Sequence, residues 1–249
     1  MYQTHWKKII SLLILIVFAW NLADAQTKPK GNYNFWNYKK KPFYFGLTLG
    51  MHSSGYLPSK SKAFVRSDTL RAITGIDRPG LNVNIITNLK IGEYFDFRFI
   101  PGFAFSERRF QYKASTLCGL SNNQVPCISN IRVESVFLEL PVLMRFKSDP
   151  YKDKRMFIVA GLKYSYDVAS SSRAREEERI NLLQISPHDF QFEIGAGMQF
   201  FFPFFIFSPE IKFSQGIGNI HILNNNLEQS KILDQVRSRA LTISFHFEG

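Results

Sequence analysis

The sequence predicts an all-β protein, namely an eight-stranded antiparallel transmembrane β-barrel of the outer-membrane type with long extracellular loops and short periplasmic turns. Three observations predict this fold class. The first residues have the pattern of a secretory signal, the remaining chain alternates apolar and polar residues with period two, and its connections are short and long in turn. Mean hydropathy is −0.12 with 15% aromatic residues, which disfavours both a helical membrane protein and a disordered chain.

The N-terminus is the expected targeting segment. Lys7 and Lys8 precede an apolar run, residues 9–20, that is too short to span a bilayer as a helix. Residues 23–25 (Ala-Asp-Ala) provide the small side chains that signal peptidase requires, and Gln26 follows where a lipoprotein would have Cys. We therefore expect a signal peptide over 1–25, a periplasmic N-terminal leader over 26–42 and the barrel domain over 43–249.

The first four barrel strands follow from alternation of side-chain type. Phe43–Met51 sets Phe and Leu against Tyr, Gly and Thr, and Leu81–Ile91 sets Leu, Val and Ile against Asn. Tyr94–Phe105 alternates Phe with charged residues, and Arg132–Lys147 alternates Val, Leu, Met and Phe with Ser, Glu and Arg. The other four expected strands are Met156–Val168, Asp189–Phe202, Phe204–Ser214 and Arg239–Phe247.

The polar face of these strands predicts a packed barrel interior. One face carries apolar side chains without charge, as lipid contact requires, since a charge at mid-bilayer costs about 2 to 4 kcal/mol. The other face carries both signs of charge in near balance, together with glycines, and eight strands leave no room for a pore. We expect a structural network of lumen charges formed by Asp96, Arg98, Glu139, Arg145, Lys163, Glu193, Glu210 and Lys212.

Connection lengths provide an independent argument. Three connections are short: Gly92–Glu93, Ser148–Asp153 and the turn at Pro203. Four are long: Ser53–Pro79, Arg109–Ile131, Ala169–His188 and Gln215–Ser238. Outer-membrane barrels have short periplasmic turns and long extracellular loops, so both termini are expected in the periplasm. The alternative for the aromatic segment around Pro203 is a buried hairpin of a soluble domain.

The leader, residues 26–42, is rich in Lys and aromatic residues, and we expect it to form no core. It is interpreted as a periplasmic tail that binds a partner or lies on the inner leaflet, or as a disordered leader. Cys118 and Cys127 lie nine residues apart in an exported chain, which favours a disulfide over two reduced thiols. Two cysteines without a neighbouring histidine do not predict a metal site.

No enzyme signature is expected, and neither a catalytic nor a cofactor-binding residue is predicted. Residues 195–197 (Gly-Ala-Gly) lie within a strand, so they predict close packing and not a nucleotide loop. His52, His188 and His221 are expected in loops at the outer rim, where barrel proteases and acyltransferases place catalytic groups. No serine stands beside His188 or Asp189 in a recognisable motif. The net charge of +11 would favour nucleic-acid binding in a cytosolic protein; export points to lipopolysaccharide or to a polar interior.

Two neighbouring segments carry a resemblance to a known family. Residues 137–146 (FLELPVLMRF) contain Leu-Glu-Leu-Pro, and residues 157–165 (FIVAGLKYS) end in Gly-x-x-Tyr-Ser. These motifs resemble the PorT family of outer-membrane β-barrels. Leu89–Phe105 is similar to the second hairpin of that family and Leu241–Phe247 to its closing strand, although the chain runs two residues further. The resemblance covers Phe43–Phe247, nearly all of the expected mature chain.

The resemblance implies a non-enzymatic role in the type IX secretion and gliding machinery of Bacteroidota, with other secretion-machinery proteins and outer-membrane lipid or lipopolysaccharide as partners. It implies no catalytic residue and no cofactor. Two alternatives from other classes stay open on the residues alone. One is a general small barrel that binds ligands or maintains the envelope, and the other is a barrel hydrolase.

Overall fold

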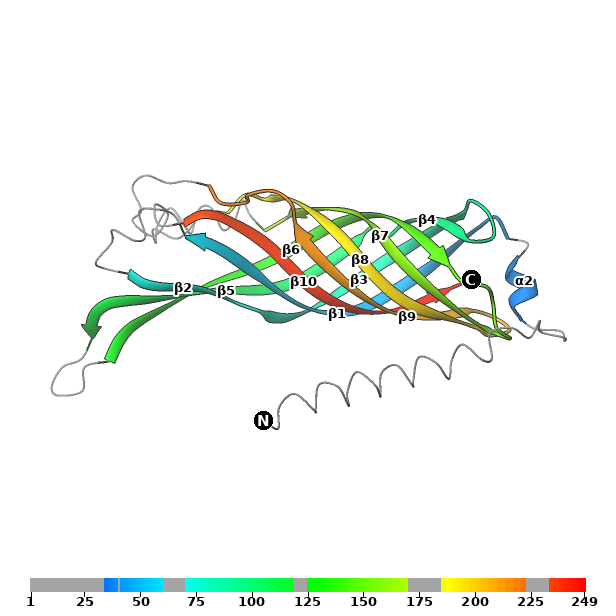
Figure 1. Cartoon of the computed structure of the whole chain (residues 1–249), viewed down its shortest axis with the longest axis horizontal. Coiled ribbons are helices and arrows are strands. Elements are labelled where there is room, and N and C mark those ends of the chain that lie inside the picture. The colour runs from blue at the N-terminus through cyan, green and yellow to red at the C-terminus, as the bar shows by residue number, and fades with distance from the viewer. Residues whose placement is uncertain (1–33, 40, 61–69, 119–124, 170–184, 223–232) are drawn as a thin grey trace, which may run out of the picture.

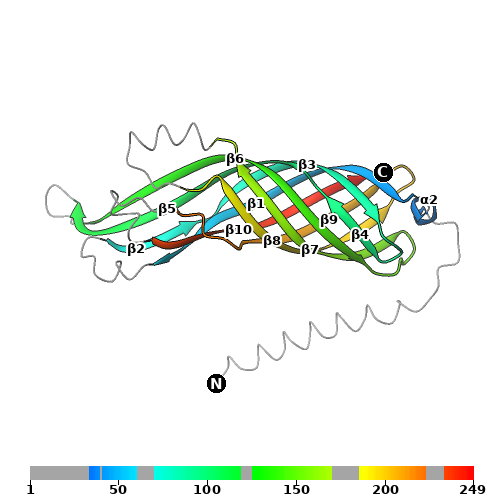
Figure 2. The ribbon, with the colours of Figure 1, turned by 90° about the horizontal axis from the view of Figure 1, so that it is seen from above.

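The computed structural model describes residues 34–39, 41–60, 70–118, 125–169, 185–222 and 233–249. Within these ranges an antiparallel sheet closes into a barrel, and the short helix α2 (Phe35–Lys39) lies at one end, here called the α2 end (Figures 1 and 2). No helix in these ranges is long and apolar enough to cross a membrane. The strands are β1 (Phe43–Lys60), β2 (Leu70–Ile76), β3 (Arg78–Lys90), β4 (Phe95–Phe99), β5 (Gly102–Cys118), β6 (Val125–Lys147), β7 (Lys154–Asp167), β8 (His188–Phe201), β9 (Ile206–Gly216) and β10 (Leu233–Glu248).

These ten strands form a ring of eight, as the sequence predicts. β1 pairs with both β10 and β3, which closes the sheet, and the other neighbours follow in chain order. β4 and β5 form one path between β3 and β6, interrupted at Ile100 and Pro101, because proline has no N–H for the ladder. β2 continues β3 beyond Asp77, so it adds length and not a ninth strand to the ring.

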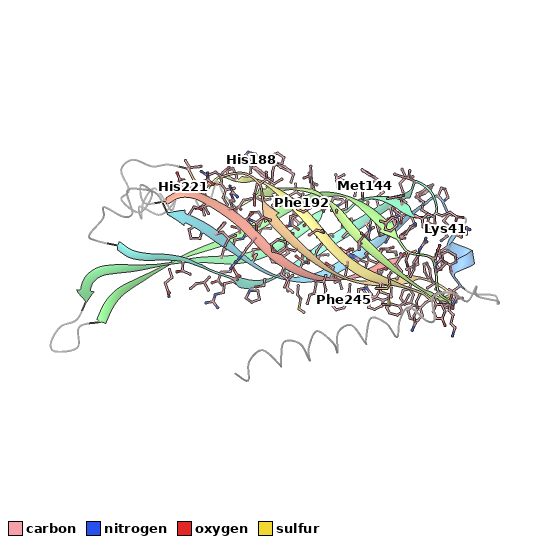
Figure 3. All side chains as sticks on the ribbon, viewed as in Figure 1. Lys41, Met144, His188, Phe192, His221 and Phe245 are labelled. Carbon is pink, nitrogen blue, oxygen red and sulfur yellow. The ribbon has the colours of Figure 1, made fainter. Side chains whose placement is uncertain are left out.

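The two faces of the sheet differ as the alternation predicts. Leu47 and Leu49 are exposed on the outside, while Thr48 between them is buried in the lumen. Met144, Phe192 and Phe245 likewise lie on the outer surface of the barrel (Figure 3). A continuous band of exposed apolar side chains on a closed sheet matches contact with lipid.

Short turns join the strands at the α2 end, as predicted. Gly92, in the turn between β3 and β4, has a φ of 148°, a backbone conformation that favours glycine. Pro203 lies in the turn between β8 and β9, where the N–H of Phe202 donates to the carbonyl of Phe205 at 2.9 Å. Phe202, Phe204 and Phe205 around it are exposed, at the edge of the apolar band.

Strands continue far past the predicted boundaries at the opposite end, here called the far end (Figure 1). β1 runs to Lys60 and pairs with β10 over Ser53–Lys60, although Ser53–Pro79 was expected as a loop. β5 and β6 likewise pair within the expected loop Arg109–Ile131. That expectation was wrong because alternation marks a strand clearly only where its outer face is apolar, and the outward positions after Met51 include Ser53, Gly55 and Ser59. The inward face is still buried there, with Tyr56 2% exposed.

Candidate functional site

The eight predicted network residues all lie in the lumen of the barrel. Asp96 and Arg98 come from β4, Glu139 and Arg145 from β6, Lys163 from β7, Glu193 from β8, and Glu210 and Lys212 from β9. Seven of them are buried, and Glu139 is half-buried with a side chain 13% exposed. The strand pleat explains the arrangement, because residues two apart, such as Glu210 and Lys212, project to the same face.

The part of the network nearest to α2 is centred on two arginines. Arg145 contacts Asp96 at 2.5 Å and Glu248 at 3.4 Å, and Lys147 forms a second ion pair with Asp96. Arg98 then contacts Glu248 at 2.6 Å. All these carboxylates and guanidinium groups are fully buried. Arg145 also donates hydrogen bonds to the hydroxyl of Tyr44 and to Oδ1 of Asn88, so the remaining guanidinium protons have acceptors.

The network continues from Arg98 towards the far end. Arg98 contacts Glu210 at 3.1 Å, and Lys212 lies between Glu210 at 3.8 Å and Glu193 at 3.2 Å. Lys163 then joins Glu193 at 3.1 Å to Glu139 at 2.9 Å. Among the described residues, five cations alternate with five carboxylates in this chain of contacts, which we call the lumen ion-pair chain. Its order is Lys147, Asp96, Arg145, Glu248, Arg98, Glu210, Lys212, Glu193, Lys163 and Glu139.

Each charge in the lumen ion-pair chain has at least one partner of opposite sign, and its five cations and five carboxylates balance. Breaking such a pair by removing one member typically costs about 3 to 5 kcal/mol, because the other charge stays buried without compensation. Apolar side chains fill the space beside it, with Ile86, Ile100 and Leu143 all 0% exposed. The interior at this level is packed, which suits a structural plug and not a conduit.

Sequence reasoning missed two members of the network. Glu248 was left outside the last predicted strand, which ended at Phe247, although Thr242, Ser244 and His246 already alternate into the lumen. Continuing the same period by two residues would have placed Glu248 inside. Lys147 was the last residue of a predicted strand and follows Arg145 on the same face, so the same rule would have found it.

Two glycines of β8 allow lumen side chains of the neighbouring strands to pack directly against the β8 backbone. A Cβ at Gly195 would lie 2.7 Å from Cγ of Lys212, and one at Gly197 would lie 2.5 Å from the ring of Phe157. Real Cβ atoms essentially never approach other atoms so closely. The Gly-Ala-Gly segment is therefore a close-packing feature of the lumen, as predicted.

One of the three histidines expected at the rim lies elsewhere. His52 belongs to β1 and is buried in the lumen, where its Nε2 is 2.8 Å from Oγ of Ser106. This serine and histidine are paired although the sequence predicted no such pair. Oγ of Ser106 also accepts a hydrogen bond from Ser54 at 3.5 Å, and a Cβ at Gly80 would lie 2.4 Å from His52 Nε2. The imidazole therefore packs closely against the backbone at Gly80, and its contact with Ser106 joins β1 to β5.

The other two histidines lie at the far end, as expected (Figure 3). Nδ1 of His188, on β8, is 2.7 Å from the hydroxyl of Tyr164, and the rings of Tyr164 and Tyr166 lie beside it. His221 pairs with Ile185 in an isolated bridge, and burial lowers its pKa from the ordinary value.

The leader contributes a cap to the barrel, which corrects the expectation that it forms no core. Phe35 and Tyr38 of α2 are buried against Phe201 and Ile206 at the ends of β8 and β9. The ring centroids of Phe35 and Phe201 lie 5.2 Å apart in an edge-to-face arrangement. A helix of five residues has too few positions to show a helical period, so the sequence pattern could not reveal it.

Hydrogen bonds tie α2 to three turns of the barrel. The backbone N–H of Phe35 donates to Asp153 at 3.2 Å, and the hydroxyl of Tyr38 donates to the carbonyl of Phe202 at 3.0 Å. Lys39 forms an ion pair with Glu93 at 2.7 Å. The pKa of Glu93 is lowered mainly by its hydrogen bond with Lys39. Since these partners belong to the β6–β7, β8–β9 and β3–β4 turns, α2 is fastened across the end of the barrel.

The predicted disulfide and signal peptide are not tested by the structure. Cys118 ends β5 and Cys127 lies near the start of β6, with Cys118 paired to Val125 in the backbone register, but both side chains lie outside the described residues. The signal peptide over 1–25 also lies outside them.

Several known barrels are similar in structure. Neisserial surface protein A matches with a TM-score of 0.43 and 11% identity over 83% of this chain and 97% of its own. OprG of Pseudomonas aeruginosa matches with a TM-score of 0.43 and 9% identity over 83% of this chain and 95% of its own. Ail of Yersinia pestis matches with a TM-score of 0.37 and 12% identity over 84% of this chain and 100% of its own. No curated protein matches the sequence significantly.

The family comparison covers most of the chain. The model of the outer membrane protein beta-barrel domain matches residues 24–221, which include every strand from β1 to β9. The closed sheet, its apolar outer band and its charged interior agree with that match. The chain therefore belongs to the outer membrane protein beta-barrel domain family and is an integral outer-membrane protein.

Proposed function

We propose that this protein is a non-enzymatic, permanently filled barrel that acts by binding other proteins of a type IX secretion and gliding apparatus. The observation that carries the proposal is the lumen ion-pair chain, which occupies the interior and leaves no passage for cargo. The α2 cap adds a second barrier at one end. With the interior filled, the surfaces beyond the membrane are the parts that act.

The secretion role rests on the resemblance of two strand motifs to the PorT family. Leu138–Pro141 on β6 and Gly161–Ser165 on β7 lie side by side, because Pro141 pairs with Lys163 and Glu139 with Ser165. Two motifs that meet in one place of a barrel form a more specific feature than either alone. The partners proposed are other proteins of the machinery, with outer-membrane lipid and lipopolysaccharide around the barrel, and the net charge of +11 favours these anionic lipids.

We further propose that both termini lie in the periplasm. Short turns gather at the α2 end, and the long strand extensions stand at the far end, which is the usual arrangement of outer-membrane barrels. In this orientation α2 faces periplasmic components, and the extensions of β1, β5 and β6 face the outside. Protease treatment of intact cells should then cut within residues 61–69 or 170–184, and cleavage confined to 149–154 would contradict the orientation.

A deletion strain tests the secretion role. Loss of the gene should leave secreted cargo in the periplasm while the outer membrane stays intact, and purification of the tagged protein from native membranes should retrieve other machinery components. Normal secretion in the deletion strain would contradict the proposal and favour a general small barrel for ligand binding or envelope integrity.

Reintroducing variants into the deletion strain distinguishes a protein-contact surface from a catalytic site. Deleting residues 26–41, or shortening the connection 169–187, should impair secretion without preventing barrel insertion if that segment contacts the partner. His52→Ala, His188→Ala and His221→Ala should each restore secretion, since none is required for chemistry. If the His188→Ala barrel inserted into the membrane but did not restore secretion, the result would favour the hydrolase alternative.

A further inference from the structure

A cavity of about 500 Å³ lies between α2 and the barrel end. Its walls come from α2, from the chain that follows it, from the turns between the strands and from the ends of β1, β3, β6, β7, β8 and β9. Ligand sites in proteins typically have volumes of about 300 to 1,000 Å³, so the space is large enough for a small molecule. Neither the family match nor the lumen ion-pair chain assigns a role to it.

Positive charge predominates in the walls of this cavity. Its lining includes five cationic side chains and two carboxylates, namely Lys39, Lys41, Lys90, Lys147 and Arg155 with Glu93 and Asp149. Lys39 is neutralised by Glu93 at 2.7 Å, and Lys147 by Asp96 in the lumen. Lys90 and Arg155 have no carboxylate within ion-pair distance among the residues that the structure describes.

Lys90 and Arg155 are held in place by neutral groups. Arg155 is 7% exposed, and its guanidinium donates to the carbonyls of Ser148 and Glu93, both at 2.6 Å. Lys90 donates to the carbonyl of Tyr38 and lies 5.4 Å from the ring centroid of Tyr44. Carbonyl oxygens orient these side chains but carry no full negative charge, so an anion in direct contact with them would be a favourable neighbour.

Apolar side chains line the cavity beside these cations, and the guanidinium of Arg155 lies 5.6 Å from the ring centroid of Phe35. Phe35, Tyr38, Phe201 and Ile206 form the cluster by which α2 packs on the barrel, and all four line the cavity. A ligand that matches this lining therefore has a charged oxygen group joined to an apolar or aromatic part.

We propose that this cavity binds a small ligand in which a carboxylate or phosphate is joined to an apolar body. Lys90 and Arg155 hold the oxyanion, and Phe35 and Phe201 contact the apolar part. The inference goes beyond the secretion role and does not depend on it, because the walls alone define the ligand chemistry.

Calorimetric titration of the full-length barrel in detergent tests the ligand class. The probes are N-acetyl-Gly-Phe with a free carboxylate, the same peptide as its neutral amide, and phenyl phosphate. At least one oxyanion should bind, and the amide should bind at least ten-fold more weakly than the acid if the acid is the ligand. Binding of the peptide acid alone identifies a peptide carboxylate, and binding of phenyl phosphate alone identifies a phosphate ester. The proposal would be overturned if neither the peptide acid nor phenyl phosphate bound. It would also be overturned if phenyl phosphate did not bind and the peptide acid and its amide bound equally well.

A pair of lysine variants locates the site. Lys90→Gln should weaken binding of the oxyanion at least ten-fold, because one of its two cationic donors is lost. Lys152→Gln is the matched control, since Lys152 lies in the neighbouring β6–β7 turn outside the cavity lining and loses the same charge. Equal weakening by the two variants would place the ligand elsewhere on the surface. If Lys90→Gln does not assemble, Phe35→Ala serves instead, and unchanged binding to that variant would exclude the cavity.

Discussion

Opposite charges meet in two settings in this barrel, inside the lumen and on the exposed surface at its ends. In the lumen, Arg98 and Glu248 lie 2.6 Å apart and both side chains are 0% exposed. At the far end, Arg239 and Asp77 lie 2.9 Å apart with side chains 39% and 37% exposed. The distances are alike, so exposure separates the two pairs. An exposed pair contributes about 0 to 1 kcal/mol, whereas breaking a buried one costs about 3 to 5 kcal/mol.

The two settings also differ in what they connect. Arg98 on β4 reaches Glu210 on β9 and Glu248 on β10, which are not neighbours of β4 in the ring. The buried pairs therefore brace the barrel across its lumen. Exposed pairs such as Lys39–Glu93 join surface segments, so they position a helix or a turn without determining the shape of the ring.

The largest effect is expected from breaking the buried network at its centre. Arg145→Met leaves Asp96 and Glu248 short of a partner and should destabilise the barrel by about 3 to 5 kcal/mol. The change in the free energy of unfolding is measured by urea titration in detergent, with the folded fraction read from heat-modifiable mobility on gels. Arg237→Met is the control, since Arg237 is exposed and its loss should change stability by less than about 0.5 kcal/mol. Equal effects of the two variants would contradict the distinction between lumen and surface.

The second largest effect on stability is expected from a disulfide in the β5–β6 hairpin. The predicted Cys118–Cys127 disulfide closes a loop of about ten residues, which by chain entropy stabilises the folded state by roughly 2 to 3 kcal/mol. The double Cys→Ser variant should still assemble, because the strand ladder and lumen pairs close the barrel without it. Mass mapping under non-reducing conditions checks the bond, and two free thiols would reject it.

A smaller effect is expected at the half-buried end of the lumen ion-pair chain. Glu139→Gln should cost about 1 to 2 kcal/mol, because Lys163 keeps Glu193 as a partner and water reaches this site. The Glu139→Gln and Lys163→Met double variant should lose less than the sum of the single changes. If Glu139→Gln left stability unchanged but abolished secretion, Glu139 would belong to a functional site and not to the structural network.

The smallest effect is expected at the exposed ion pair of α2. Lys39 lowers the pKa of Glu93, so the attraction between them is fully present above the ordinary carboxyl pKa and is lost as pH falls through the lowered value. Lys39→Gln should return the pKa of Glu93 towards its ordinary range and leave barrel stability nearly unchanged. An NMR titration of Glu93 measures this change, and an ordinary Glu93 pKa in the unmodified protein would contradict it.

The same contrast explains what could be predicted from sequence. Where one face of a strand meets lipid, the period of two places residues such as Glu210 and Lys212 inside with no further information. Their partners could not be predicted, because Arg98 meets Glu248 across the lumen only after the ring has closed with a particular stagger. The sequence therefore indicated which charged side chains face the lumen, but not which of them form ion pairs with each other.

Beyond the membrane the sequence signal disappears although the strands continue. Ser53–Lys60 still pairs with β10, but it lacks the apolar alternation that marks Phe43–Met51. The cap was missed for another reason, since Phe35 and Tyr38 find their apolar partners more than 150 residues later in the chain, at Phe201 and Ile206. Long-range packing of this kind leaves no local pattern.

Single-channel recording in planar lipid bilayers tests most directly the claim that the lumen is a structural plug. Purified full-length barrel should insert and show no steady conductance, because the lumen ion-pair chain and the side chains packed beside it fill the interior. A stable, ohmic open channel in the unmodified protein would contradict the account, since ions would then pass where Arg98, Arg145 and Glu248 are fully buried.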